Sequence, residues 1–380
     1  MNPFVYQNFC SDSFFCPPIK TIHKLENMII ADSNVLISSA VRYGKTSLVQ
    51  YYLENKIDKN QYLTFYFDFF NTNNYIDFVK IIYKQIAQYL PYDYNMTLKV
   101  LKELFNVVRF NAVIDQNGIL EFTPNLNSYN FDELMSDIYK GLMKLSVKSK
   151  KKVILAFDEF QQVLVMEDSN VKKGLKRCMD QYPEIRYIFI GSKKYLMEET
   201  FFSKTSLLSN QAQKLEFSSI EPDEIFTFIN TKFNNNLSRE LFNKMHRKTK
   251  GNIGLIQEVC YHLYYYKRLE NKELEISEND IETVCNRLLN SKSEYYKLLL
   301  NRLSTPHKIA IKAVIISGGY ELYTKNNLFK LQVTKSSLNT AIKYLYKDEL
   351  IDKDENNRYF IVDSCFELWY HNILLQSNLN

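Results

Sequence analysis

The residues best suited to bind phosphate lie between Val35 and Tyr51, in the segment VLISSAVRYGKTSLVQY. A short apolar run ends in small residues, and Gly44-Lys45-Thr46 then leads directly into a helical pattern. A loop that joins a strand to a helix in this way directs backbone N–H groups and the positive end of the helix dipole into one concavity. The Lys45 ammonium would reach the phosphate oxygens, and the Thr46 hydroxyl suits a Mg²⁺ ligand. The segment therefore predicts a phosphate-binding loop.

The motif G-x-x-x-x-G-K-[ST] has its first glycine where this chain has Ser39. Serine adopts a positive φ less readily than glycine, so this loop departs from the usual one. On its own, a Gly-Lys-Thr triplet is also compatible with an ordinary surface turn. The residues that we expect to contact a nucleotide through the loop are Ser39, Arg42, Tyr43, Gly44, Lys45, Thr46 and Ser47.

The acidic pair Asp158-Glu159 supports the loop, because it follows the apolar run 153–157. Such a run is typical of a central parallel strand, and ligands bind at the carboxyl ends of these strands in open α/β sheets. Asp158 would hold Mg²⁺ through water, and Glu159 would polarise the attacking water as a general base. An exposed acidic pair at a strand end is the alternative, which the loop upstream disfavours. A base within the nucleotide site favours an ATPase over a small-molecule kinase.

A third polar strand end is Ser192, which closes the β-type run 186–192. A hydroxyl at this position could contact the γ-phosphate or the attacking water. A plain Gly-Ser turn at the end of a strand explains the same residues equally well. Both interpretations stay open.

The elements that must position these residues alternate along the first 218 residues. Further β-type runs cover 62–68 and 215–217, and helical patterns cover 19–30, 75–89, 132–145 and the region around 171–179. This alternation predicts an α/β fold with a doubly wound parallel sheet and right-handed crossovers. The region 91–129 is partly helical, with a hairpin expected around 115–118. Residues 1–13 have no clear period, and we expect them to lie over the nucleotide domain.

The strand signal ends at Pro222, and four helical patterns follow over 222–233, 238–249, 254–267 and 277–289. Several of them begin with Ser, Asn or Asp, which favour helix N-caps. We interpret this region as a helical lid. Its turn at 250–254 either lies near the nucleotide or only joins two lid helices.

The last part of the chain predicts a winged helix. Three helical patterns at 305–316, 324–331 and 334–348 precede an alternating hairpin at 350–353 and 358–362. As a recognition helix, the third would bring basic side chains to nucleic-acid phosphates. A solvated lysine stripe on a protein-binding surface explains the pattern equally well. The residues in question are Lys335, Asn339, Lys343 and Lys347.

Length and composition indicate the number of domains, the kind of partner and the compartment. A chain of 380 residues suits two or three domains, and we predict boundaries that give 1–218, 219–292 and 293–380. The net charge of +5 argues only weakly for an anionic partner. Six scattered cysteines predict neither a zinc site nor disulfides and fit a reducing cytosol. No apolar run approaches the roughly 18 residues that span a membrane, so we expect a cytoplasmic protein.

These motifs resemble a known family. The segments SAVRYGKTS, ILAFDEFQ, IFIGS, KGNIGLIQ and VDSCFELWYHN occur in the order found in the prokaryotic archaeal-type ATPases. That family belongs to the signal-transducing branch near the AAA+ proteins and the origin-recognition ATPases. The resemblance covers about residues 14–375 and implies a P-loop NTPase that binds ATP and Mg²⁺ between an AAA+-like sheet domain and a lid.

The chain departs from the family pattern at three points. Ser39 replaces the usual first glycine, Ile253 stands where the lid turn usually has Gly-Asn-Pro, and no arginine finger can be placed. These departures favour slow or partner-dependent hydrolysis. The nuclease-like extension of many relatives does not follow the winged helix, so we expect the effector to be a separate protein.

Three functions compete. The first is an ATP-driven switch that engages DNA or a protein partner, through homo-oligomerisation, in prokaryotic defence or mobile-element regulation. The alternative is a scaffold that holds nucleotide, hydrolyses it weakly and binds a separate effector. The third, phosphate transfer to a small molecule, is disfavoured by Glu159 and by the winged helix.

Overall fold

The computed structural model describes residues 2–6, 14–39, 44–90, 94–114, 120–126, 129–166, 169–216, 220–269, 276–354 and 356–377. These residues form two compact units. The sheet unit contains 19–39 and 45–216. The helical unit contains 2–6, 14–18, Gly44 and the described residues from 220 onward. Each unit is considered by itself.

The sheet unit is built on five parallel strands in the order β2-β5-β6-β1-β7. Every residue of β1 is buried, as is nearly every residue of β5 and β6, which explains their continuous apolar runs. β2 alternates between half-buried and buried residues. The strands are β1 (Val35–Ser38), β2 (Tyr62–Asp68), β5 (Lys152–Asp158), β6 (Arg186–Gly191) and β7 (Gln213–Lys214). The carboxyl ends of these strands therefore meet at one edge.

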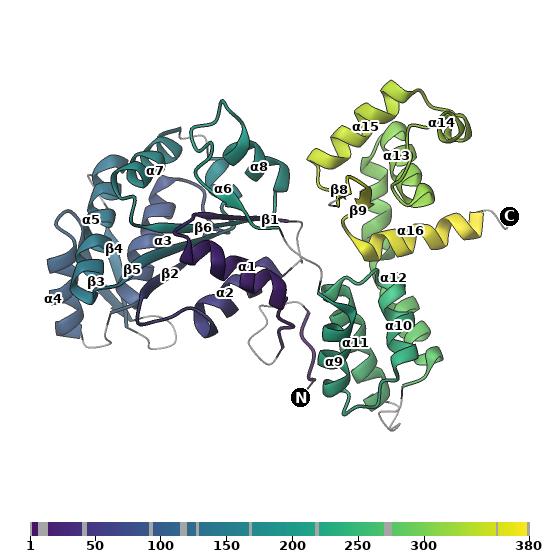
Figure 1. The fold of residues 1–380 in the computed structure, drawn as a ribbon, viewed down its shortest axis with the longest axis horizontal. Helices are drawn as coiled ribbons and strands as arrows, with labels where there is room; N and C mark the ends of the chain where they lie inside the picture. The colour runs from purple at the N-terminus through teal and green to yellow at the C-terminus, as the bar shows by residue number, and fades with distance from the viewer. Residues whose placement is uncertain are drawn as a thin grey trace. The chain divides into compact units, whose positions relative to one another are not determined.

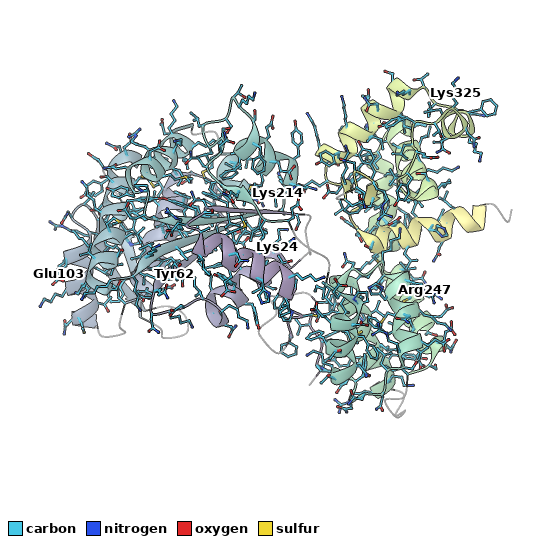
Figure 2. All side chains as sticks on the ribbon, viewed as in Figure 1. Lys24, Tyr62, Glu103, Lys214, Arg247 and Lys325 are labelled. Carbon is cyan, nitrogen blue, oxygen red and sulfur yellow. The ribbon has the colours of Figure 1, made fainter. Side chains whose placement is uncertain are left out.

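The predicted doubly wound sheet is confirmed, because helices lie on both faces of it (Figure 1). Side chains fill the space between the sheet and these helices (Figure 2). The helices are α1 (Ile19–Ile30), α2 (Lys45–Asn55), α3 (Tyr75–Gln88), α5 (Phe131–Ser149), α6 (Gln161–Leu164), α7 (Ser169–Gln181) and α8 (Lys194–Phe202).

The fifth strand lies earlier than predicted. β7 pairs with β1 at Gln213 and Lys214, whereas the prediction began at Leu215. Both strand residues are exposed, so the apolar signal marked the next residue, which is buried and donates its N–H to the carbonyl of Leu36 at 2.9 Å. Phe217 lies outside the described residues.

The poorly patterned region 91–129 forms a helix and a hairpin. α4 (Tyr94–Leu104) precedes β3 (Arg109–Ile114) and β4 (Leu120–Asn125), which pair antiparallel as predicted, although the turn at 115–118 lies outside the described residues. Asp137 on α5 holds this region in place. Its buried carboxylate accepts hydrogen bonds from the Tyr83 hydroxyl and from the backbone N–H groups of residues 106–108.

The helical unit begins with α9 (Pro222–Lys232), α10 (Arg239–Lys248), α11 (Ile253–Leu269) and α12 (Glu278–Arg302). The predicted lid helices are therefore present, but α12 does not end near residue 289. It continues to Arg302, so the predicted domain boundary at 292 falls inside one helix. The three-domain division itself stays a prediction.

The N-terminal residues 2–6 pack in the helical unit, so the prediction that they belong with the nucleotide domain is wrong. Phe4 is fully buried, and its ring centroid lies 4.7 Å from that of Phe233. The Asn2 amide donates to the carbonyl of Tyr261 at 3.0 Å, and the Lys232 ammonium donates to the carbonyl of Pro3 at 2.9 Å. A single apolar anchor of this kind has no periodicity that a sequence could reveal.

The C-terminal part contains three helices followed by a two-stranded antiparallel hairpin. These are α13 (Thr305–Ser317), α14 (Lys325–Leu331), α15 (Lys335–Lys347), β8 (Ile351–Lys353) and β9 (Tyr359–Ile361), close to their predicted bounds. A final helix, α16 (Ser364–Ser377), was not predicted. It packs on α12, where the Trp369 indole N–H donates to the Ser293 hydroxyl at 3.1 Å. Across the described residues, every helix is too short or too polar to pass through a membrane.

Candidate active site at the carboxyl edge of the sheet

The predicted phosphate-binding loop joins β1 to α2. Gly44 has φ +79°, a left-handed conformation that suits glycine, and Lys45 is the first residue of α2. The Lys45 side chain is only 6% exposed, and its ammonium folds back to donate to the carbonyl of Ser39 at 2.6 Å. The predicted residues Arg42 and Tyr43 lie outside the described residues. The Lys45 ammonium thus lies close to the end of β1, next to Ser39.

Two hydroxyls at the start of this loop have no partner. Within the described part of the chain, the buried Oγ atoms of Ser38 and Ser39 make no hydrogen bond. An unsatisfied buried polar group costs about 1–3 kcal/mol, and such a group in a native site indicates a missing polar partner. Among the described residues, these two hydroxyls therefore have unused hydrogen-bonding capacity at the end of β1. A phosphate group, rich in acceptor oxygens, matches that capacity.

Asp158 is the last residue of β5 and is 2% exposed. Its Oδ2 accepts hydrogen bonds from the Thr46 hydroxyl at 2.7 Å and from the Tyr66 hydroxyl, while its Oδ1 accepts the N–H of Glu159 at 2.8 Å. The structure thus joins the predicted residues Thr46 and Asp158, which come from α2 and from the end of β5. Both side chains offer oxygen atoms, the donors that Mg²⁺ prefers.

Tyr66 is a site residue that the sequence analysis missed. It lies on β2 opposite Ala156, two residues before Asp158 on β5, so its side chain points to the same face of the sheet. Burial raises the pKa of its hydroxyl well above the usual value, and the charge of Asp158 raises it further. Tyr66 therefore remains a neutral donor to the carboxylate. No pattern in the sequence pairs Tyr66 with Asp158, because the two residues meet only through the register of β2 and β5.

Glu159 and Ser192 are brought together by a residue that was not predicted as a site residue, Gln161. The Gln161 amide nitrogen donates to Glu159 Oε2 and, at 3.0 Å, to Ser192 Oγ. The N–H of Ser192 donates to the Gln161 Oε1 atom at 3.1 Å. Ser192 is thus part of a buried polar network rather than a plain turn. Its contact with a phosphate or with water remains a prediction.

The edge therefore combines a cation, a hydroxyl paired with a buried carboxylate, and a second carboxylate 3.5 Å from a serine hydroxyl. A cation with free loop donors can bind a polyphosphate. A positioned carboxylate can accept a proton from water. This set of groups suits hydrolysis of a phosphoanhydride.

The lid turn has a structural explanation within the helical unit. Gly251 has φ +70° and donates its N–H to the carbonyl of His246 in the last turn of α10. This hydrogen bond caps the end of the helix. The Asn252 side chain accepts the N–H of Leu255 at 3.0 Å, which caps α11. These two caps account for the conformation of the turn. Proximity to a nucleotide stays a prediction.

The predicted face of α15 is partly as expected. Lys335, Lys343 and Lys347 are exposed, but Asn339 is half-buried and accepts a hydrogen bond from the Tyr323 hydroxyl at 3.3 Å. An open pocket of about 480 Å³ is lined by Tyr323, Lys335, Ser336 and Asn339. Asn339 is therefore less available to a base edge than the helical spacing suggested.

Comparisons with known proteins support the fold. No protein-family model matches the chain. An uncharacterised ATP-binding protein of Methanocaldococcus jannaschii is 25% identical over 151 residues, which are 38% of this chain and 35% of that protein. The chain thus matches only about a third of the length of that relative. A second protein so named, from the same organism, is 23% identical over 343 residues, or 84% of this chain and 87% of that protein.

Two solved structures are similar over almost the whole chain. The Walker-type ATPase of Pyrococcus abyssi has a TM-score of 0.64 at 15% identity and covers 97% of this chain and 99% of its own. The ORC2 protein of Aeropyrum pernix, solved in ADPNP and ADP complexes, has a TM-score of 0.53 at 15% identity, with 95% and 94% covered. These similarities show that the chain has the same parallel-sheet α/β fold as these two proteins.

The donors to Asp158 can be tested through Tyr66→Phe. We expect this change to lower the free energy of unfolding by about 1.5 kcal/mol, because the buried carboxylate loses one hydrogen bond. Chemical denaturation measures the difference. The matched control is Tyr62→Phe on the same strand (Tyr62 is labelled in Figure 2), which should stay within about 0.5 kcal/mol of the parent. An equal decrease in the free energy of unfolding in the two variants would contradict the role of Tyr66 as a donor to Asp158.

Proposed function

We propose that this protein binds ATP with Mg²⁺ at the carboxyl edge of its sheet and hydrolyses it. The observation that carries the proposal is the meeting of Lys45, the Thr46–Asp158 pair and Glu159 at one edge. Lys45 would exchange the Ser39 carbonyl for the β- and γ-phosphate oxygens, which accept a charge-assisted hydrogen bond. The orphaned hydroxyls of Ser38 and Ser39 would find acceptors on the same phosphates.

Thr46 and Asp158 would hold the metal ion, which when bound neutralises charge on the phosphates. Glu159 would accept a proton from water as the water oxygen bonds to the γ-phosphorus. The bond from that phosphorus to the bridging oxygen then breaks, and the products are ADP and inorganic phosphate. Relatives and structural neighbours named as ATP-binding proteins and as a Walker-type ATPase support this assignment.

The helical unit would couple the nucleotide state to a partner. The order of α13, α14, α15 and the β8–β9 hairpin is that of a winged helix, which we propose as its C-terminal domain after lid residues 219–292. Two features support transmission between these parts. α12 runs without a break from lid to C-terminal part, and Lys250 in the lid turn forms an ion pair with the buried Glu367 on α16.

We propose duplex DNA as the partner, through the exposed lysines of α15, which a phosphate backbone would neutralise. A second candidate function is a scaffold that holds ATP, turns it over slowly and binds a separate effector protein. The serine at position 39 favours this alternative, because its side chain occupies a loop position that glycine usually keeps open. The half-buried Asn339 also favours the scaffold, because this side chain is less available to a DNA base.

Lys45→Ala should abolish measurable ATP binding, a loss of at least about 100-fold in affinity, because it removes a cation that reaches the phosphates. Isothermal titration with Mg-ATP measures this, and circular dichroism should remain native. The control is Lys56→Ala, which removes an exposed lysine just after the same helix and should leave the affinity unchanged. Binding as tight as that of the parent would refute the loop assignment.

Glu159→Gln should lower kcat at least about 100-fold while the Kd for ATP changes less than about twofold, because a positioned general base is lost but no phosphate contact is. Phosphate release measures kcat. The control is Glu54→Gln at an exposed position of α2, which should turn over ATP as the parent does. Unchanged turnover in Glu159→Gln would mean that another group activates the water.

The DNA contact can be tested by replacing Lys335, Lys343 and Lys347 together with alanine. Three phosphate contacts should give a plot of log K against log[salt] a slope of about −2.7, at roughly −0.9 per contact. The triple variant should lose most of that slope and bind all sequences more weakly, because an ammonium reads charge rather than base identity.

Fluorescence anisotropy with a labelled duplex, with and without ATP, measures this slope. A control variant with the same change in charge replaces three exposed lysines of the sheet unit, Lys59, Lys99 and Lys140. Its slope should remain close to that of the parent. Absence of binding at low salt in both nucleotide states, or a triple variant that binds like the parent, would rule out DNA and leave a protein partner.

A further inference from the structure

Gln161 is a buried amide that connects the ends of two neighbouring strands. It is the first residue of α6, directly after the turn that follows β5, and only 2% of it is exposed. Its side chain contacts Glu159 at the end of β5 and Ser192 just after β6. Buried polar atoms usually have at least one hydrogen-bond partner, and here both the nitrogen and the oxygen of the amide have one.

The direction of the Gln161 amide is determined by its partners. The backbone N–H of Ser192 can only donate, so the atom that faces it at 3.1 Å must be the amide oxygen. The amide nitrogen must then face the Glu159 carboxylate and the Ser192 hydroxyl. Glu159 therefore receives an N–H donor whose position is set by the backbone of the neighbouring strand.

This contact leaves one oxygen of Glu159 available. Gln161 and, at 3.5 Å, the Ser192 hydroxyl both approach Oε2. Oε1 has no hydrogen-bond partner within the described part of the chain. A carboxylate held by one oxygen can present its other oxygen to a water molecule in a defined direction.

The backbone of Glu159 is also held in an uncommon conformation. Its φ is +51°, in the left-handed region, which costs a residue with a side chain on the order of 1 kcal/mol. The N–H of Glu159 bonds to Asp158 Oδ1, and the N–H of Phe160 bonds to the carbonyl of Ile190 at 2.9 Å. These bonds maintain the strain and direct the Glu159 side chain toward β6.

The neighbouring strand leaves space for the amide. A Cβ atom on Gly191 would lie 2.8 Å from Gln161 Oε1 and 2.7 Å from Met197 Sδ. Both distances are shorter than real Cβ contacts. Glycine at this position therefore allows Gln161 to reach the backbone of Ser192.

We propose that Gln161 is a positioning residue for Glu159: its amide, oriented by Ser192, holds Oε2 so that Oε1 faces the attacking water. This inference rests on the proposed ATPase function. Without the amide, the carboxylate of Glu159 can rotate away from the water. A misplacement of about 1 Å can cost on the order of 100-fold in rate, and we expect a loss of at least about 10-fold in kcat.

The first test is Gln161→Leu, which keeps the size of the side chain and removes its hydrogen bonds. We expect kcat to fall at least about 10-fold while the Kd for Mg-ATP stays within about twofold of the parent. The control is Gln162→Leu, the same change at the next, half-buried position, which should leave kcat unchanged. A change in Kd with an unchanged kcat would mean that Gln161 only supports the fold, and would overturn the inference.

A second test asks whether Gln161 acts through Glu159. In the Glu159→Gln background, Gln161→Leu should cause no further loss in single-turnover rate, because the group that it positions is already absent. If the double variant loses the product of the two single-variant reductions in rate, Gln161 acts independently of Glu159, and the inference is wrong. A purely structural contribution would also appear in both backgrounds.

A third variant, Gln161→Glu, covers the case in which Gln161→Leu does not fold. It keeps an acceptor for the Ser192 N–H but replaces the N–H donor with an oxygen, so the same loss in kcat is expected at unchanged Kd. Parent-like turnover in this variant would overturn the inference. If the parent hydrolyses ATP and Lys45→Ala does not, such a result refutes only the role of Gln161. If the parent neither binds nor hydrolyses ATP, the proposed function fails, and the inference fails with it.

Discussion

The burial of one carboxylate organises the carboxyl edge of the sheet. Asp158 is almost completely enclosed, and a buried charge is tolerated only where donors surround it. Its three donors come from the start of α2, from β2 and from its own neighbour in sequence. The need of Asp158 for donors therefore links the start of α2, which follows β1, to β2 and β5, although β6 lies between β1 and β5 in the sheet. Two of the three donors, Thr46 and Tyr66, lie more than 90 positions before Asp158 in the chain.

The second carboxylate of the edge is held in a different way. Glu159 is accessible enough to accept a proton, and its donors lie on one side only. The two adjacent acidic residues thus have distinct environments: Asp158 accepts three hydrogen bonds on its two oxygens, whereas both contacts to Glu159 are on one oxygen. Separate environments of this kind allow two neighbouring carboxylates to take different roles in one reaction. The difference between Asp158 and Glu159 follows from the helices and strands that surround each residue, because both side chains are carboxylates.

Sequence patterns were sufficient to predict the parallel sheet and the position of Asp158 at the carboxyl end of a buried strand, because both depend on local signals. Tyr66 and Gln161 were missed because their roles exist only once β2, β5 and β6 are aligned. The length of α12 was missed because the polar residues Ser291 to Ser293 resemble a helix end. In the structure Ser291 bonds back to the carbonyl of Leu288 and Lys292 pairs with Glu258, so the helix continues. The roles of Tyr66 and Gln161 and the length of α12 depend on tertiary contacts, which the periodicity of a sequence does not show.

The packing of Phe4 in the helical unit has a consequence for biosynthesis. The segment that contains Asn2 and Phe4 is synthesised well before its partner Tyr261, which lies 259 residues after Asn2. At about 5–20 residues per second, the segment waits on the order of 10 to 50 seconds for the helices that bury it. The sheet unit is encoded between them and can fold during that interval. The core of the helical unit combines Phe4 with residues from Ile225 to Trp369, so it can be completed only after the sheet unit has been synthesised.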